Sequence, residues 1–200
     1  MARKYSTMRN RLLLAALAAC AVLATMPARA DDTKPSDPLL KEASNLLKQG
    51  DLPAALERAD KAIAAQPGNA EARFLRGVIL TEQQRTPEAI TVFTQLTQDF
   101  PEMAEPYNNL AVLYASQGEY ERARLALVQA IRANPRYATA YENLGDVHVA
   151  LALQAYQKSL DLEARNNPVK AKLAVAREVA PAGARVKRPE PAPATPSQQR

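Results

Sequence analysis

The sequence contains few of the residues on which catalytic and metal chemistry depends. Its 200 residues include one histidine, His148, and one cysteine, Cys20. A zinc site needs three or four ligands, most often histidine and cysteine, and two such residues do not supply them. Glycine occurs only six times, and the chain has no glycine-rich phosphate loop or serine-nucleophile motif. The sequence therefore predicts no metal centre, no cofactor and no catalytic site, and it favours a binding function.

An excess of positive charge is also missing once the start of the chain is set aside. The whole chain has 26 lysines and arginines against 21 aspartates and glutamates, but residues 1–30 hold five of the basic residues and no acidic ones. The remainder is balanced at 21 of each sign. The high isoelectric point is thus no evidence for nucleic-acid binding, and we expect no nucleic-acid partner.

Residues 1–30 have the pattern of an export signal. A basic start precedes an apolar run from Leu12 to Thr25, and Ala28-Arg29-Ala30 provides a small-x-small cleavage site. The run is shorter than the roughly 20 apolar residues of a membrane span. We expect cleavage after Ala30 and a periplasmic protein, which then lacks cysteine and has no disulfide or thiol chemistry.

A second interpretation of the signal is a lipoprotein. Leu17-Ala18-Ala19-Cys20 looks like a lipobox, in which Cys20 is acylated and becomes the new amino terminus. The protein is then attached to the outer membrane. The residues after Cys20 stay apolar, where lipoproteins usually become polar, so simple cleavage is preferred and lipidation remains the alternative.

From Ser36 to about Arg165 the sequence repeats itself at one fixed period. The copies span 36–69, 70–103, 104–137 and a degenerate 138–165. A fixed period of this length predicts a solenoid of helix-turn-helix units. The repeating columns are Ala55, Ala89 and Ala123; Pro67, Pro101 and Pro135; Ala43, Gly77, Ala111 and Gly145; and Leu46, Leu80, Tyr114 and His148.

The third copy shows the pattern of one unit most clearly. Its apolar residues fall at helical spacing on either side of Gly118, and a proline follows the second helix. The residues that carry the pattern are Tyr107, Leu110, Ala111, Tyr114, Gly118, Ala123, Ala130 and Pro135. This pattern resembles the tetratricopeptide repeat (TPR). The resemblance implies an all-α, right-handed superhelix whose first helices line a concave groove, and it says little about function.

The fourth copy departs from the pattern because the five residues that make its turn are missing. We therefore expect one long helix from about Ala138 to Glu163, with a tight turn near Ala150 as the alternative, followed by a capping helix over 166–180. His148 occupies a column of packing residues and is expected to be buried or half-buried. A polar leader over 31–35 precedes the repeats, and the proline- and alanine-rich residues 181–200 are expected to be disordered.

The resemblance also predicts which residues face the groove. One turn of the first helices carries Leu40, Phe74, Asn108 and Glu142, the next carries Ser44, Val78, Val112 and Asp146, and Asn109 and Asn143 lie alongside. One end of the groove is thus apolar and the other is polar and acidic. Chaperone-binding TPR domains grip a C-terminal carboxylate with lysine and asparagine. Lysine is missing from these positions, so we reject a carboxylate clamp and expect a ligand with apolar and basic or amide side chains.

The sequence leads to a non-catalytic periplasmic TPR scaffold or adaptor. Its groove is expected to bind a protein or peptide, in support of a cell-envelope complex. The alternative is an outer-membrane lipoprotein, acylated at Cys20, that acts as an assembly factor. An enzyme is the least favoured interpretation, because no constellation of catalytic residues supports it.

Overall fold

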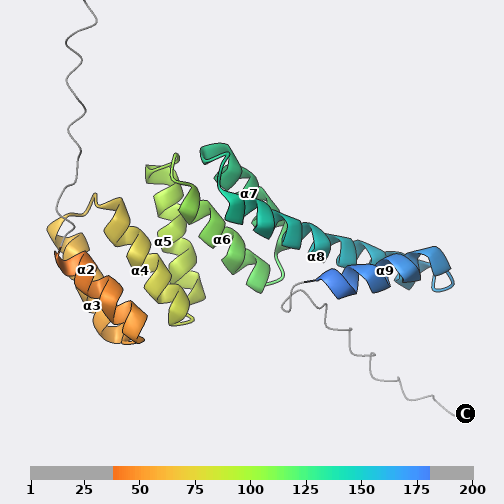
Figure 1. The fold of residues 1–200 in the computed structure, drawn as a ribbon, viewed down its shortest axis with the longest axis horizontal. Helices are drawn as coiled ribbons and strands as arrows, with labels where there is room; N and C mark the ends of the chain where they lie inside the picture. The colour runs from red at the N-terminus through yellow and green to blue at the C-terminus, as the bar shows by residue number, and fades with distance from the viewer. Residues whose placement is uncertain (1–37, 181–200) are drawn as a thin grey trace, which may run out of the picture. The chain divides into compact units, whose positions relative to one another are not determined.

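The computed structural model describes residues 38–180, and in this range it contains eight α-helices and no strands (Figure 1). The predicted signal, Cys20, the leader 31–35 and the segment 181–200 lie outside the described residues. None of the described helices combines the length and the apolar character needed to cross a membrane. The helices are α2 (Pro38–Gln49), α3 (Leu52–Ala65), α4 (Ala70–Glu82), α5 (Thr86–Asp99), α6 (Ala104–Ser116), α7 (Tyr120–Ala133), α8 (Ala138–Leu162) and α9 (Asn167–Val179).

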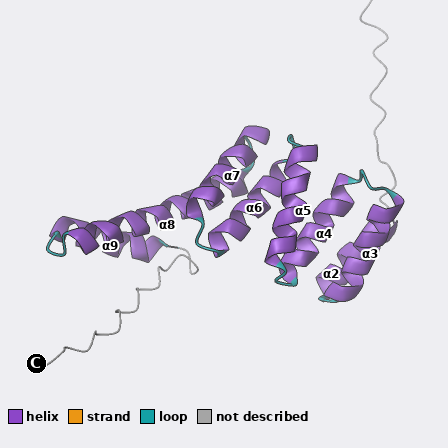
Figure 2. Ribbon diagram, turned by 180° about the vertical axis from the view of Figure 1, so that it is seen from behind, coloured by secondary structure: helices purple, strands orange, loops and turns teal. Residues whose placement is uncertain are grey.

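The helices keep the period of the sequence. The second helices α3, α5 and α7 begin one period apart, at Leu52, Thr86 and Tyr120, and the first helices α4, α6 and α8 begin at the same spacing. Each helix packs on its neighbours in the chain, and α2–α7 stand as three successive pairs in both views (Figures 1 and 2). The prediction of an all-α solenoid of paired helices is confirmed.

The turn inside each regular pair depends on one residue with a left-handed backbone. Gly50, Gln84 and Gly118 occupy the same position in successive repeats, and their φ angles are 80°, 58° and 78°. This conformation ends the first helix, because the amide of the next residue can reach back to an unpaired carbonyl. The bonds that recur are Asp51 N–H to Leu46 O (3.0 Å), Arg85 N–H to Leu80 O (2.9 Å) and Glu119 N–H to Tyr114 O (2.9 Å).

A column of small residues lets the two helices of a pair cross closely. A Cβ placed on Gly77 of α4 would lie 2.7 Å from Cε1 of Phe93 in α5, which is closer than real Cβ contacts. Ala43 and Ala111 fill the same column in α2 and α6, and both are buried. One apolar cluster then runs without interruption from Leu80 in α4 to Val147 in α8.

The fourth repeat has no turn, as predicted. Its helix α8 continues from Ala138 to Leu162, and Ala152, at the position of Gly50 and Gly118, is an ordinary helical residue. Helix α9 then packs along the distal half of α8, burying Leu173 and partly burying Val169 and Ala176.

The missing turn changes the surroundings of His148. The prediction that His148 is buried or half-buried is wrong, because its side chain is exposed. Leu80 and Tyr114, in the same column, are buried. In the regular repeats the second helix folds back beside this column, whereas the distal half of α8 runs straight on. His148 therefore faces solvent.

Candidate functional site

The apolar end of the predicted groove is taken up by packing. Leu40 is only 5% exposed and lies in a cluster with Ala62 and Ala72, so it offers little surface to a ligand. Phe74 is half-buried, with its ring centroid 5.6 Å from that of Phe93 at an interplanar angle of 58°. Val78 is half-buried as well. Leu40 therefore packs between the first two repeats, and Phe74 and Val78 pack against the cluster that begins in the second repeat.

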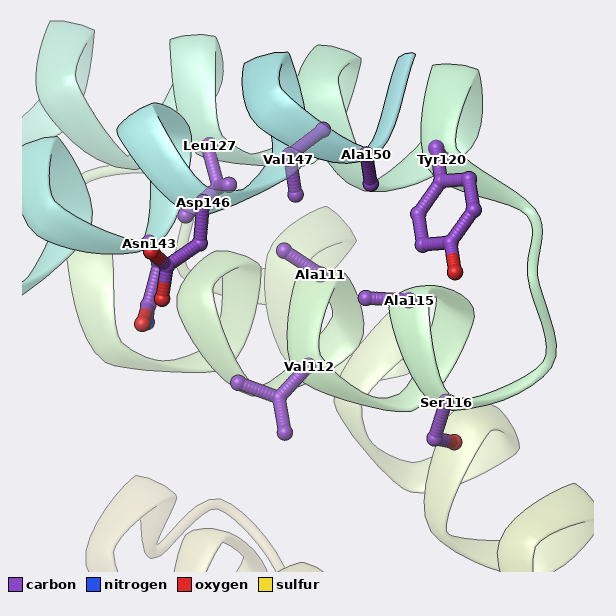
Figure 3. Close-up of a pocket in the computed structure, with 10 residues that line it drawn as sticks. All are labelled: Ala111, Val112, Ala115, Ser116, Tyr120, Leu127, Asn143, Asp146, Val147 and Ala150. Carbon is purple, nitrogen blue, oxygen red and sulfur yellow. The ribbon is translucent and has the colours of Figure 1, made fainter. Parts of the chain in front are cut away.

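A pocket of about 220 Å³ opens between α6 and α8 (Figure 3). Three residues of the predicted groove line it, namely Val112, Asn143 and Asp146. The remaining lining residues were not predicted, and they are Ala111, Ala115 and Ser116 of α6, Tyr120 and Leu127 of α7, and Val147 and Ala150 of α8.

Small side chains on both walls create this pocket. Ala111 and Val147 point toward each other across it (Figure 3), while Ala115 and Ala150 leave the rest of the gap unfilled. The buried side chain of Leu127 contributes from α7. The interior of the pocket is therefore apolar, and a ligand side chain placed there loses its contact with water at little cost in polar contacts.

The polar groups gather at one end of the pocket. Asn143 and Asp146 lie at this end and Tyr120 at the other (Figure 3). Glu142 and Asp146 are both exposed, and neither forms an ion pair within residues 38–180. Asp146 thus gives this end of the pocket a carboxylate without an ion-pair partner in that range, and Glu142 lies one helical turn before it on the same face of α8.

The two asparagines of α6 are committed to structure. Asn108 is 7% exposed, and its Oδ1 accepts a hydrogen bond of 2.8 Å from Nδ2 of Asn143. This bond joins α6 to α8 across the wall of the pocket and satisfies a polar group that would be costly to bury alone. Asn109 donates to the backbone oxygen of Glu105 at 2.9 Å, one turn back in its own helix.

One further polar group near α6 stays neutral. The pKa of Tyr137, between α7 and α8, is raised by burial and, to a smaller extent, by the carboxylate of Glu105. Its hydroxyl is therefore protonated across the physiological range.

Within residues 38–180, no group of three or more histidines, cysteines or carboxylates is arranged to hold a metal ion. The chemistry that the arrangement supports is the binding of an apolar side chain beside a cation.

Two family models of the tetratricopeptide repeat match the chain, one over residues 40–104 and the other over 80–145. Together they span more than half of it. Among curated proteins, the human PEX5-related protein is 32% identical over 97 residues, which is 48% of this chain and 16% of that protein. The chloroplastic tetratricopeptide repeat domain-containing protein PYG7 of Arabidopsis thaliana is 28% identical over 102 residues, covering 46% of this chain and 34% of its own length. The chain thus spans about a sixth of the human relative.

Solved structures share the fold at low sequence identity. A thermophilic TPR protein of Thermus thermophilus aligns with a TM-score of 0.54 and 21% identity, over 73% of this chain and 84% of its own. The first TPR domain of Spaghetti (RPAP3), bound to the HSP90 peptide SRMEEVD, aligns with a TM-score of 0.54 and 18% identity, over 57% and 90%. An O-GlcNAc transferase of Thermobaculum terrenum aligns at 0.52 and 24%, over 60% of this chain and 25% of the transferase.

Proposed function

This chain belongs to the tetratricopeptide repeat family, and from that premise we propose that it is a non-catalytic scaffold that binds a protein or peptide partner at the α6–α8 pocket. TPR proteins are protein-interaction scaffolds, and one protein of the same fold has been captured with a peptide. The observation that carries the proposal is the pocket itself, which is apolar inside and has Asp146 and Asn143 at one end.

The pocket favours a ligand with one small apolar side chain next to a basic one. A volume of about 220 Å³ is enough for one such side chain. The exposed carboxylates of Glu142 and Asp146 attract a lysine or arginine and disfavour an acidic peptide. The peptide SRMEEVD bound by the RPAP3 domain is acidic, so we propose a ligand of the opposite charge for this chain.

The periplasm is the proposed location, in support of a cell-envelope complex. The support is the basic start, the apolar run and the Ala28-Arg29-Ala30 site in the sequence. Osmotic-shock release and an intact mass beginning at Asp31 are expected. A lipid adduct on Cys20 and release only by detergent would instead establish the alternative, an acylated assembly factor at the outer membrane.

Site-specific photo-crosslinking in cells tests the binding site. A photoreactive residue at Val112, which is 48% exposed and lines the pocket, is expected to form adducts with a discrete partner. The matched position is Leu125 of α7, which is 55% exposed and does not line the pocket. The proposal is supported if adducts form from Val112 and not from Leu125, and if Asp146→Lys abolishes them. Equal adducts from both positions, or adducts unaffected by Asp146→Lys, contradict it.

A further inference from the structure

The chain itself contains a segment with the chemistry that the α6–α8 pocket favours. Residues 185–188 read Arg-Val-Lys-Arg, a small apolar side chain between basic ones. We propose that this segment occupies the pocket as an internal ligand, with Val186 inside it and Arg185 and Lys187 beside Glu142 and Asp146. The inference rests on the proposed function, because it names a ligand for that same pocket and makes an outside partner compete for it.

The end of α9 lies close enough to the pocket for this contact. Val149 of α8 shares a groove of about 410 Å³ with Val175 and Ala176 of α9. The next residue, Ala150, lines the α6–α8 pocket, and α9 ends at Val179. The last turn of α9 and the pocket are therefore beside the same turn of α8.

The length of chain after α9 is sufficient. Val186 is six residues beyond Ala180, the last described residue. Six extended residues reach about 20 Å, which exceeds the roughly 10–12 Å diameter of a helix with its side chains. The segment can thus pass around α8 from the end of α9 to the pocket.

The order of residues suits the site. In an extended conformation with about three residues per turn, the neighbours of Val186 project to either side of it. With Val186 in the apolar interior, the guanidinium of Arg185 and the ammonium of Lys187 then lie outside the pocket. The carboxylate of Asp146 lines the pocket, and Glu142 lies one helical turn away on the same face of α8. Neither forms an ion pair within residues 38–180. Burial of Val186 and attraction between the opposite charges therefore both favour binding of the segment in this position.

Because the segment belongs to the same chain as the pocket, even a weak contact between them leads to high occupancy. A short flexible linker gives an attached ligand an effective concentration on the order of 1 mM. If the free segment bound with a dissociation constant of about 0.1 mM, the pocket would be occupied about nine-tenths of the time, and an outside ligand would bind about tenfold more weakly.

A fluorescence anisotropy titration tests the proposal with a defined probe. The probe is a labelled peptide with the sequence of residues 183–190, titrated into the purified chain and into the full-length R185E/K187E/R188E variant. The variant, whose own segment no longer competes, is expected to bind the probe about tenfold more tightly. Adding Asp146→Lys should abolish that binding. Adding Asp161→Lys, a matched change at an exposed position of α8 outside the pocket, should not.

Amide NMR spectra give a second readout. Reversing the tail charges should shift the signals of Val112 and Ala150 and leave those of Ala55 and Ala59 in α3 unchanged. Equal probe affinity of the two chains overturns the proposal, as does a difference that grows with protein concentration, which indicates the segment of a second copy. If the probe binds neither chain while Val112 still crosslinks a partner in an Asp146-dependent way, the internal ligand is wrong and the proposed function stands.

Discussion

The three regular helix pairs (α2–α7) and the C-terminal pair (α8 and α9) begin with the same repeat pattern in sequence, but their helices form different contacts. In α4 a Cβ on Gly77 would meet the ring of Phe93, whereas a Cβ on Gly145 of α8 would meet nothing within 4 Å. Both glycines occupy one column of the repeat. The difference follows from the turn, because the second helix returns to cover the column in one case and runs straight on in the other. A residue's place in a repeat thus determines its burial only when the turn that brings its partner is present.

The largest difference between the two regions is expected for truncated leucines. Leu127 of α7 is fully buried and Leu162 at the end of α8 is 78% exposed. Leu127→Ala should lower the free energy of unfolding by about 2–5 kcal/mol, because it leaves a cavity in the continuous core. Leu162→Ala should change it by less than about 0.5 kcal/mol. Urea unfolding followed by circular dichroism measures both, and similar losses for the two variants would show that the distal part of α8 is buried in solution.

The glycine column gives the next largest effect. Gly77→Ala should cost about 1–3 kcal/mol, because the added methyl group must displace the buried Phe93 ring. Gly145→Ala should instead raise the stability by up to about 1 kcal/mol, because alanine favours the helix and space is open around it. The same urea titration applies. Loss of stability in both variants would mean that another segment covers Gly145.

The turn position should respond with opposite signs in the two regions. Gln84→Gly should stabilise the chain by about 0.5–1 kcal/mol, since glycine adopts a φ of 58° without the penalty of a side chain, and this relief exceeds the cost of its greater freedom in the unfolded state. Ala152→Gly, at the equivalent position inside α8, should destabilise it by about 1 kcal/mol. Thermal melting of the two variants against the parent chain is the measurement. The comparison fails if both changes act in the same direction.

The smallest expected effect concerns charge. The regular pairs are joined by ion pairs such as Arg73 Nη2 to Asp99 Oδ2 at 2.6 Å, while α8 and α9 are joined by a hydrogen bond of 3.3 Å from Arg177 to Gln157. Asp99 is half exposed, so Asp99→Asn should cost no more than about 1 kcal/mol. That cost should shrink at a salt concentration of about 1 M, whereas a Gln157→Ala variant should show no salt dependence. If salt leaves the cost of Asp99→Asn unchanged, that cost comes from packing against Phe100 and not from the ion pair. The Arg73 guanidinium also approaches the Phe100 ring.

The fold could be predicted because the columns that recur at the repeat period record both the helix faces and the turns. The missing turn in the fourth copy predicted the long α8 for the same reason. His148 was mispredicted because its column indicates burial only where a second helix returns. The pocket was predicted in part. Val112, Asn143 and Asp146 follow from helical register, but alanines at positions 115 and 150 have no chemical signature, and it is their small size that leaves the space.

The packing of Leu40 and Phe74 could not be foreseen from register alone. A residue on the inner turn of a first helix faces either the groove or the next repeat, depending on how closely the helices approach. In the first two repeats, Leu40 and Phe74 pack within the protein. Phe74→Ala would therefore lower stability, and a binding test should use Asp146→Lys instead.

The unbroken α8 also sets a distance. Asp146 and Leu162 lie on one continuous helix, and the rise between them is about 24 Å. Helix α9 packs against part of this stretch, beside Val149, Ala152 and Tyr156. A partner seated at the pocket and a second body attached near Leu162 are consequently held at a fixed separation and angle. In this respect the lost turn adds a spacer to a helix whose first half still forms one wall of the pocket.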